Sequence, residues 1–145
     1  MSAENKAIIR RVVDELMNKK NQALIDEFYS TDYRADTPDG SFQGRDGLRE
    51  LYGLYVTAFP DFHFTIEDMI AEDDKILTYY TFTGTNNGIV LGLPPTGKQV
   101  RVKAAMITRV SHGKIMDDRF VWDSLALVTQ LGLVKFEPRK TGTTA

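Results

Sequence analysis

The hydrophobic pattern of the sequence changes at Pro60, and this change limits the fold more than any other feature. Before Pro60, apolar residues recur every three or four positions, which is the spacing of amphipathic helices. These segments begin at Ser2, Asn21 and Gly44. After Pro60, apolar and polar residues alternate, as on half-buried strands. The alternating segments cover residues 62–67, 76–85, 100–109 and 113–123. We therefore expect the α+β class, with three N-terminal helices packed on one face of a curved, mainly antiparallel sheet.

Two shorter elements complete this expectation. Residues 33–37 read as a short extended segment, and residues 125–131 as a closing helix. No internal repeat or linker divides the 145 residues, and a chain of this length can bury one core. We expect a single domain over residues 1–136 and a mobile, Thr-rich tail over residues 137–145.

Composition narrows the possible partners. The net charge is -2 and basic residues are interspersed with acidic ones, which argues against a nucleic-acid surface. The sequence has no cysteine, which excludes disulfides and thiolate metal ligands, and its two histidines, His63 and His112, lie too far apart to suggest a metal site. No apolar run reaches the length of a membrane span, and the N-terminus lacks the pattern of a signal peptide. We expect a cytoplasmic protein that acts on a small molecule.

The last strand carries charges where a core strand would be apolar. Asp117, Arg119 and Asp123 share one parity, so on a pleated strand they project to the same side. The opposite parity carries Met116, Phe120 and Trp122. Burial of unpaired charges costs several kcal/mol each, so three charges on one face suggest a functional role.

Seven short segments resemble, in order, the SnoaL-like polyketide cyclases of the nuclear-transport-factor-2-like superfamily. They are AFPD at 58–61, IED at 66–68, AEDD at 71–74, TGT at 83–85, GLPPTG at 92–97, RVSHGKI at 109–115 and QLG at 130–132. The resemblance runs from about Ile8 to Leu133. It implies a cone-shaped, cystatin-like α+β barrel whose mouth is a ligand pocket. It also implies a homodimer or higher homo-oligomer paired through the sheet, and no metal or organic cofactor.

The resemblance further implies an activity and a catalytic residue. The characterised cyclases close a ring in a polyketide ester by intramolecular aldol condensation, and Asp123 stands where they have their catalytic acid/base. A carboxylate beside a bound carbonyl compound can remove the alpha proton, and the acid can return a proton to the new alkoxide. We expect Arg119 to polarise or anchor an oxygen of the substrate. We expect Asp117 to act as an orienting partner and not as the base. Relatives often have Glu, His and Trp where this chain has Asp117, Asp118 and Arg119.

Each candidate residue also has a structural interpretation. Asp123 could cap the closing helix, and Arg119 could pair with Asp117. Trp122, with the opposite parity, is expected on the outer face or at a subunit interface. Candidate substrate-binding residues are a carboxylate before Thr37, four aromatic residues and an apolar loop that could form a lid or be buried against a neighbouring subunit. They are Asp36, Tyr33, Tyr52, Tyr55, Phe59 and Leu91. Asp36 could instead stabilise a turn, and the aromatic residues could be core.

Two other functions fit the same residues. Limonene-epoxide hydrolases of this superfamily use two Asp and an Arg to activate water, and Asp117, Arg119 and Asp123 supply those residue types. The enzyme could therefore add water or open a ring. The third hypothesis is a small-molecule-binding module without catalysis, since fold does not fix function. In each case we expect a small apolar or aromatic carbonyl compound as the ligand.

Overall fold

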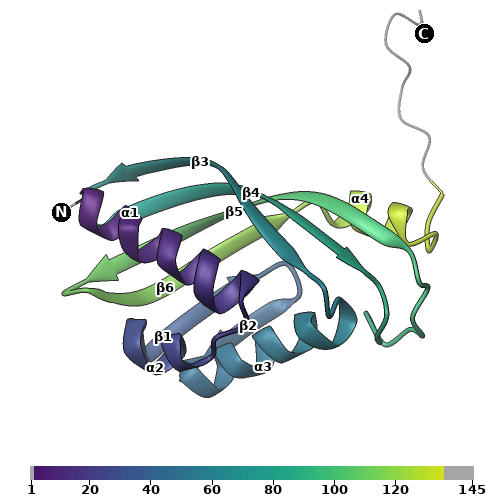
Figure 1. The fold of residues 1–145 in the computed structure, drawn as a ribbon, viewed down its shortest axis with the longest axis horizontal. Coiled ribbons are helices and arrows are strands. Elements are labelled where there is room, and N and C mark those ends of the chain that lie inside the picture. The colour runs from purple at the N-terminus through teal and green to yellow at the C-terminus, as the bar shows by residue number, and fades with distance from the viewer. Residues whose placement is uncertain (1, 136–145) are drawn as a thin grey trace, which may run out of the picture.

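A computed structural model describes residues 2–135, and the tail predicted over residues 137–145 lies outside this range. The helices are α1 (Ser2–Arg11), a π-helix η1 (Val12–Asn18), α2 (Ala23–Phe28), α3 (Gly44–Ala58) and α4 (Ser124–Gln130). The strands are β1 (Tyr29–Thr37), β2 (Gly40–Gln43), β3 (His63–Glu72), β4 (Lys75–Thr85), β5 (Gln99–Ser111) and β6 (Lys114–Trp122). The helices and strands occur in the expected order, and the expected α+β class is confirmed (Figure 1).

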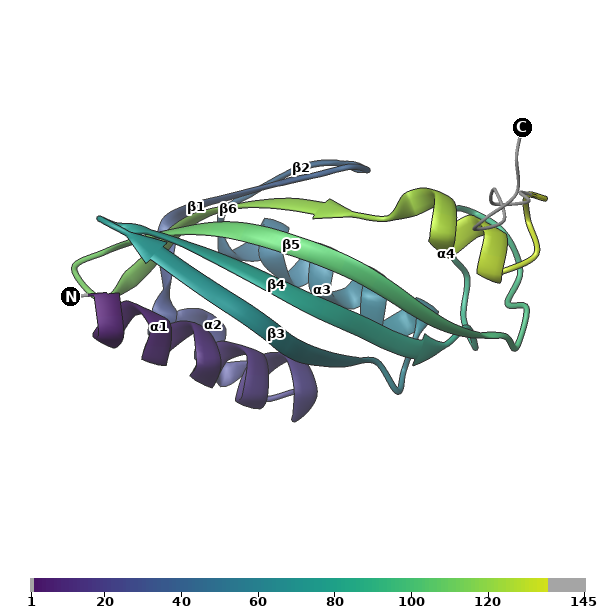
Figure 2. The same ribbon diagram turned by 90° about the horizontal axis from the view of Figure 1, so that it is seen from above.

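The strands form one sheet in the order β2-β1-β6-β5-β4-β3. The long strands β3 to β6 form the expected antiparallel meander, while β1 pairs with β6 in parallel. Two features differ from the sequence expectation. Strand β1 begins at Tyr29, before the expected segment over residues 33–37, and β2 forms a hairpin with it. Figure 2 shows the strands arching over α3, with α1 running beside β3.

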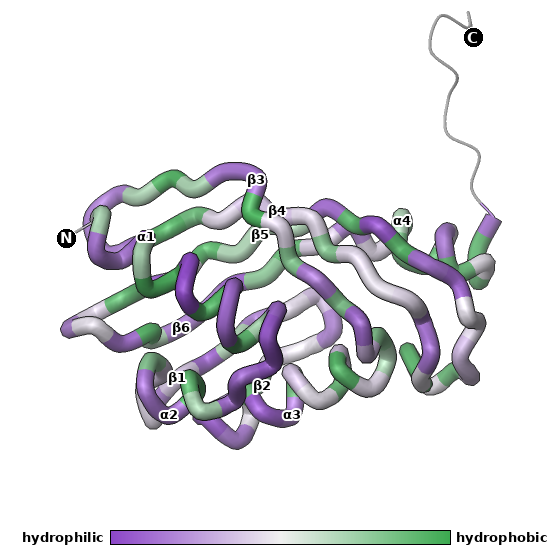
Figure 3. The backbone as a smooth tube through the Cα atoms, viewed as in Figure 1, coloured by the Kyte–Doolittle hydropathy of each residue, from purple (hydrophilic) through white to green (hydrophobic). Residues whose placement is uncertain are grey.

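Alternating burial along the strands shows which face is the interior. On β5, the side chains of Val102, Ala104 and Met106 are buried, whereas Arg101 and Lys103 are exposed. The tube in Figure 3 shows the same pattern as hydrophobic segments interrupted by hydrophilic ones. The buried parity packs toward the helices, which is the arrangement expected when one sheet face is covered. None of the helices described in residues 2–135 is long and apolar enough to cross a membrane.

The end of η1 is tied to the start of β3. Lys20 adopts a left-handed conformation with φ 60°, and its Nζ donates to the carbonyls of Met17 at 2.8 Å and Phe62 at 2.9 Å. The side-chain amide of Asn18 donates to the Phe64 carbonyl at 2.9 Å and accepts from the Phe64 N–H at 2.8 Å. These bonds fix the positions of Met17, Phe62 and Phe64, which line the interior cavity.

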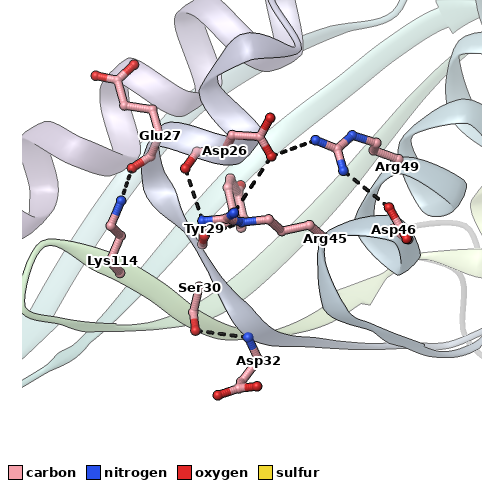
Figure 4. Close-up of polar contacts among 9 residues, drawn as sticks. All are labelled: Asp26, Glu27, Tyr29, Ser30, Asp32, Arg45, Asp46, Arg49 and Lys114. Atoms are coloured by element: carbon pink, nitrogen blue, oxygen red, sulfur yellow. Dashed lines mark hydrogen bonds and ion pairs between the residues drawn. The ribbon is translucent and has the colours of Figure 1, made fainter.

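Two arginines of α3 hold it against the α2–β1 junction (Figure 4). The Nε of Arg45 donates to the Tyr29 carbonyl at 2.9 Å, and its second amine donates to the Asp26 carbonyl at 3.1 Å. Arg49 donates to the Asp26 carboxylate at 2.7 Å. The carbonyls at this junction thus gain charged donors, and α3 is fixed where it forms one wall of the interior.

Candidate functional site

A cavity of about 70 Å³ lies between α3 and the inner face of strands β3 to β6. It is lined by Met17, Leu48, Leu51, Tyr52, Tyr55, Phe59, Phe62, Phe64, Tyr80, Phe82, Val102, Ala104, Phe120, Trp122 and Leu127. No charged side chain among the described residues is part of this lining. The cavity wall therefore includes three predicted ligand residues: Tyr52 and Tyr55 of α3, and Phe59, which directly follows the helix. A wall of this kind excludes water and suits a flat, apolar ligand.

The aromatic side chains of the wall are packed against one another. Phe64 and Tyr80 stack with ring centres 4.6 Å apart and planes at 12°. Tyr55 meets Trp122 edge-on at 5.7 Å, and Phe59 meets Phe82 edge-on at 5.3 Å. Such pairs each contribute roughly 0.5–1.5 kcal/mol beyond their buried area, so the ring orientations are well defined.

Asp118 is a carboxyl group buried on the inner face of β6, with 3% of its surface exposed. Its Oδ2 accepts from the Tyr33 hydroxyl at 2.7 Å, and its Oδ1 accepts from the Thr108 hydroxyl. Burial raises the pKa of Asp118 from 3.8 to about 6, although these two hydroxyl donors oppose the rise. The group therefore changes its protonation near neutral pH, as a general acid/base must.

Asp117 and Arg119 lie on the outer face of β6, and Asp123 follows the strand as the N-cap of α4, so none of the three is on the cavity wall. Asp117 accepts from the Nε of Arg109 at 2.8 Å, and Arg119 is exposed. Asp117 and Arg119 do share one face of β6, but the prediction that this face lines a pocket is wrong. Trp122 was predicted on the outer face, and that too is wrong, since it lines the cavity.

Asp123 holds the position of a helix cap. Its Oδ1 accepts from the Ala126 N–H at 2.9 Å, at the start of α4. The side chain is exposed, although the residues beside it, Trp122 and Leu127, reach the cavity. The hydrogen bond from Ala126 supports the interpretation of Asp123 as a helix cap. The carboxyl group of Asp123 is not part of the cavity lining.

The remaining predicted ligand residues lie elsewhere. Tyr33 is buried behind the cavity wall, bonded to Asp118. Asp36 accepts from Ser41 at 2.7 Å on the outer face of β1, and this hydroxyl, followed by the Arg34 side chain, lowers its pKa. Leu91 is exposed in the loop between β4 and β5 and does not line the cavity.

A bulge explains why parity alone misplaced the charges. The β5–β6 hairpin pairs Val110 with Ile115, but the register then shifts, and Arg109 pairs with Asp117. The extra residue, Met116, reverses which parity faces inward. Asp118 was missed as a site residue for this reason, and Tyr80 of β4 was missed because the sequence does not show which residue it lies opposite. The signal that could have found them is the pairing of Phe120 and Trp122 with the apolar parity of β5.

With this geometry established, comparison with known proteins identifies the family. The model of the SnoaL-like polyketide cyclases matches residues 7–131. The chain belongs to the SnoaL-like polyketide cyclase family. This SnoaL-like domain spans the helices, the whole sheet and α4, so the cavity and Asp118 both lie within the matched region. A search of curated proteins returned no significant match.

Solved structures show the same fold. A candidate SnoaL-like polyketide cyclase from Jannaschia superposes with a TM-score of 0.85 at 20% identity, covering 92% of this chain and 94% of the other. AclR, a candidate hydroxylase from Streptomyces galilaeus, gives a TM-score of 0.83 at 26% identity over 94% and 90%. A protein of ketosteroid isomerase-like fold from Catenulispora acidiphila gives 0.75 at 16% over 88% and 93%. The predicted nuclear-transport-factor-2-like fold is thereby confirmed.

Proposed function

We propose that this SnoaL-like protein closes a ring in a polyketide-like carbonyl compound by an intramolecular aldol reaction in the aromatic cavity, without a cofactor. The observation that carries the proposal is the cavity wall. It is aromatic and aliphatic, has no charged side chain among the described residues, and adjoins a buried carboxyl group with a raised pKa. A conjugated substrate would be desolvated there, and its enolate is stabilised by its own conjugation.

The proposed chemistry conserves atoms and electrons. A carboxylate removes a proton alpha to one carbonyl, and the resulting enolate carbon attacks a second carbonyl of the same molecule. One carbon–carbon bond forms, and the oxygen of the attacked carbonyl takes a proton from the carboxylic acid. The net change is an isomerisation, so no oxidant or reductant is required.

We assign the proton transfer to Asp118 rather than to Asp123. Asp118 is buried on the cavity side of β6, and its pKa of about 6 lets it both accept and return a proton near pH 7. Asp123 is exposed and its carboxylate is engaged by the first turn of α4. Asp118 also stands where relatives often carry a histidine, which is another group that titrates near neutrality.

The cavity must widen for such a substrate. Its volume of about 70 Å³ is well below the roughly 300–1,000 Å³ of typical ligand pockets. Phe120 lies between Asp118 and Trp122 on the inner face of β6 and is only partly buried. We propose that Phe120 swings aside when substrate binds, which extends the cavity toward Asp118.

The test compares two isosteric variants, Asp118→Asn and Asp123→Asn. The assays are ring closure of a linear aromatic poly-β-keto ester and deuterium uptake at the alpha carbon of 1-indanone in D₂O. We expect Asp118→Asn to lose roughly 10²-fold or more in both rates, and Asp123→Asn to stay within a few-fold of the parent, because its amide oxygen still caps α4.

Loss in Asp123→Asn alone would transfer the role to Asp123. Incorporation of ¹⁸O from labelled water would indicate hydrolysis instead, and binding without turnover in the parent would indicate a binding module.

A further inference from the structure

Two hydroxyl groups on the cavity wall have no hydrogen-bond partner among the described residues. They belong to Tyr55 of α3 and Tyr80 of β4. Other tyrosines of the interior do have partners, since Tyr33 donates to Asp118 at 2.7 Å and Tyr52 donates to the Leu16 carbonyl at 3.3 Å. Both rings line the cavity, so two hydroxyl donors that are not used within the described residues point to a ligand there.

The packing around Tyr80 holds its ring in the cavity wall. Only 3% of Tyr80 is exposed, and its ring stacks on Phe64. In the sheet register Tyr80 lies opposite Ala104, which lies opposite Trp122 on the next strand. The single methyl group of Ala104 leaves room between two large rings, and the cavity occupies this space.

Tyr55 enters the same space from the helical side. Its ring contacts Phe82 edge-on at 6.0 Å and Trp122 at 5.7 Å. Burial raises the pKa of Tyr55, followed by the charge of Asp39 and the neighbouring Tyr80 hydroxyl. Burial likewise raises the pKa of Tyr80, with a further contribution from Asp118. Both phenols therefore stay protonated at working pH and act as donors, not as bases.

We propose that the hydroxyls of Tyr55 and Tyr80 form a two-donor site for the oxygen of a flat cyclic ketone or its enolate. This proposal rests on the proposed function and names the part of the substrate that the cavity recognises. Two neutral donors in a water-excluded wall stabilise a developing enolate oxygen. Because no cation among residues 2–135 lines the cavity, the same site should reject a carboxylate of similar shape.

The sequence provides a reporter for this site. Trp122 is the one tryptophan of the chain and lines the cavity, so ¹⁵N-labelled protein has a single indole N–H signal. The probes are 1-indanone, indane and indane-1-carboxylate, which share one ring system and differ in the oxygen they present. We expect titration of the indole signal to give an affinity for 1-indanone at least tenfold above those for indane and the carboxylate.

Variants then test the two donors. Tyr55→Phe and Tyr80→Phe should each reduce the preference for 1-indanone over indane about fivefold, which corresponds to one hydrogen bond, and leave the indane affinity unchanged. Tyr79→Phe is the matched control, because Tyr79 is the next residue of β4 and is 41% exposed on the outer face. Equal affinities for 1-indanone and indane in the parent would overturn the proposal, as would an unchanged preference in both Phe variants.

If the ketone preference fails while ring closure still depends on Asp118, only this inference is wrong. If the preference holds and no ring closure or exchange occurs, the proposed function is wrong.

Discussion

Burial of Asp118 lowers the stability of the fold when its carboxyl group is charged, and the same burial lets the group titrate near neutral pH. Its carboxyl group is buried between the hydroxyls of Tyr33 and Thr108, and the described residues give it no ion pair. Desolvation disfavours the charged form, so the pKa of Asp118 rises from 3.8 in the unfolded chain to about 6 in the folded one. Folding therefore binds a proton between these two pH values.

The sign of the linkage follows directly from this rise. The stabilising effect of the protonated group is complete below about pH 4 and is lost as the pH rises through about 6. The difference between 3.8 and 6 corresponds to about 3 kcal/mol. We predict that the free energy of unfolding decreases by about half of this amount between pH 5 and 7.5, the rest being lost below pH 5. We also predict that Asp118→Asn abolishes most of this decrease and exceeds the parent in stability at pH 8.

Urea denaturation at several pH values measures this effect. Asp36 and Asp61, whose pKa values are lowered by their hydrogen bonds, titrate below this window and do not obscure it. Asp123→Asn is a suitable control, since this exposed carboxylate accepts from the Ala126 N–H and is not among the groups that raise the pKa of Asp118. Parallel pH profiles for Asp118→Asn and the parent would contradict the burial of a titrating carboxyl at this position.

At the level of elements, sequence alone predicted most of the helices and strands and misassigned the functional face of β6. Hydrophobic period identifies an element and the residues that share a face, but it does not say which face is inside. The register from the β5–β6 turn assigns the face only if no residue is inserted, and the bulge at Met116 inserts one. Ile115 and Asp118 consequently both face inward despite their opposite parity. Tyr55 was predictable, because α3 has no such irregularity.

The cap of α4 gives a prediction that separates structure from catalysis. Asp123→Ala removes the acceptor for the Ala126 N–H and should lower the free energy of unfolding by about 1 kcal/mol. Asp123→Asn retains an acceptor oxygen and should remain within a few tenths of a kcal/mol of the parent. Urea denaturation of the three proteins measures both differences. Equal losses in the two variants would mean that the charge, and not the cap, is what Asp123 contributes.

The loop between β4 and β5 is anchored to the end of α3 at one glycine. The Gly88 N–H donates to the Ala58 carbonyl at 3.3 Å, and a Cβ on Gly88 would overlap the carbonyl oxygen of Thr57. Gly88→Ala must therefore displace the loop, and we predict a loss of about 2–3 kcal/mol in the free energy of unfolding. Gly92→Ala in the same loop meets open space and should cost only about 1 kcal/mol for its φ of 72°. A smaller loss for Gly88→Ala than for Gly92→Ala would show that the loop is not held there.

At the scale of the whole molecule, the helices cover only one side of the sheet. The parallel pairing of β1 with β6 joins segments about eighty residues apart, so no local sequence pattern predicts it. This pairing completes the arch over α3. The outer face of β3 to β6 is left without a covering element in residues 2–135 (Figure 2). Its centre carries apolar side chains: Ile70, Leu77, Tyr79, Ala105, Ile107 and Val121. Val121 is 64% exposed and Ile70 58%, so apolar area remains available for association.

We predict that two copies of the chain associate through this outer face. The patch is bordered by both signs of charge, including Lys103, Arg119 and Asp68, so a copy turned to face it can match acid with base. Val121→Glu places a charge at the apolar centre and should convert the dimer to a monomer in sedimentation equilibrium, without loss of the folded state by circular dichroism. Leu54→Glu is the matched control, because Leu54 is 55% exposed on α3, away from the sheet. If Val121→Glu leaves the mass unchanged while Leu54→Glu lowers it, the copies meet through the helices. In that case the exposed face of the sheet would be free.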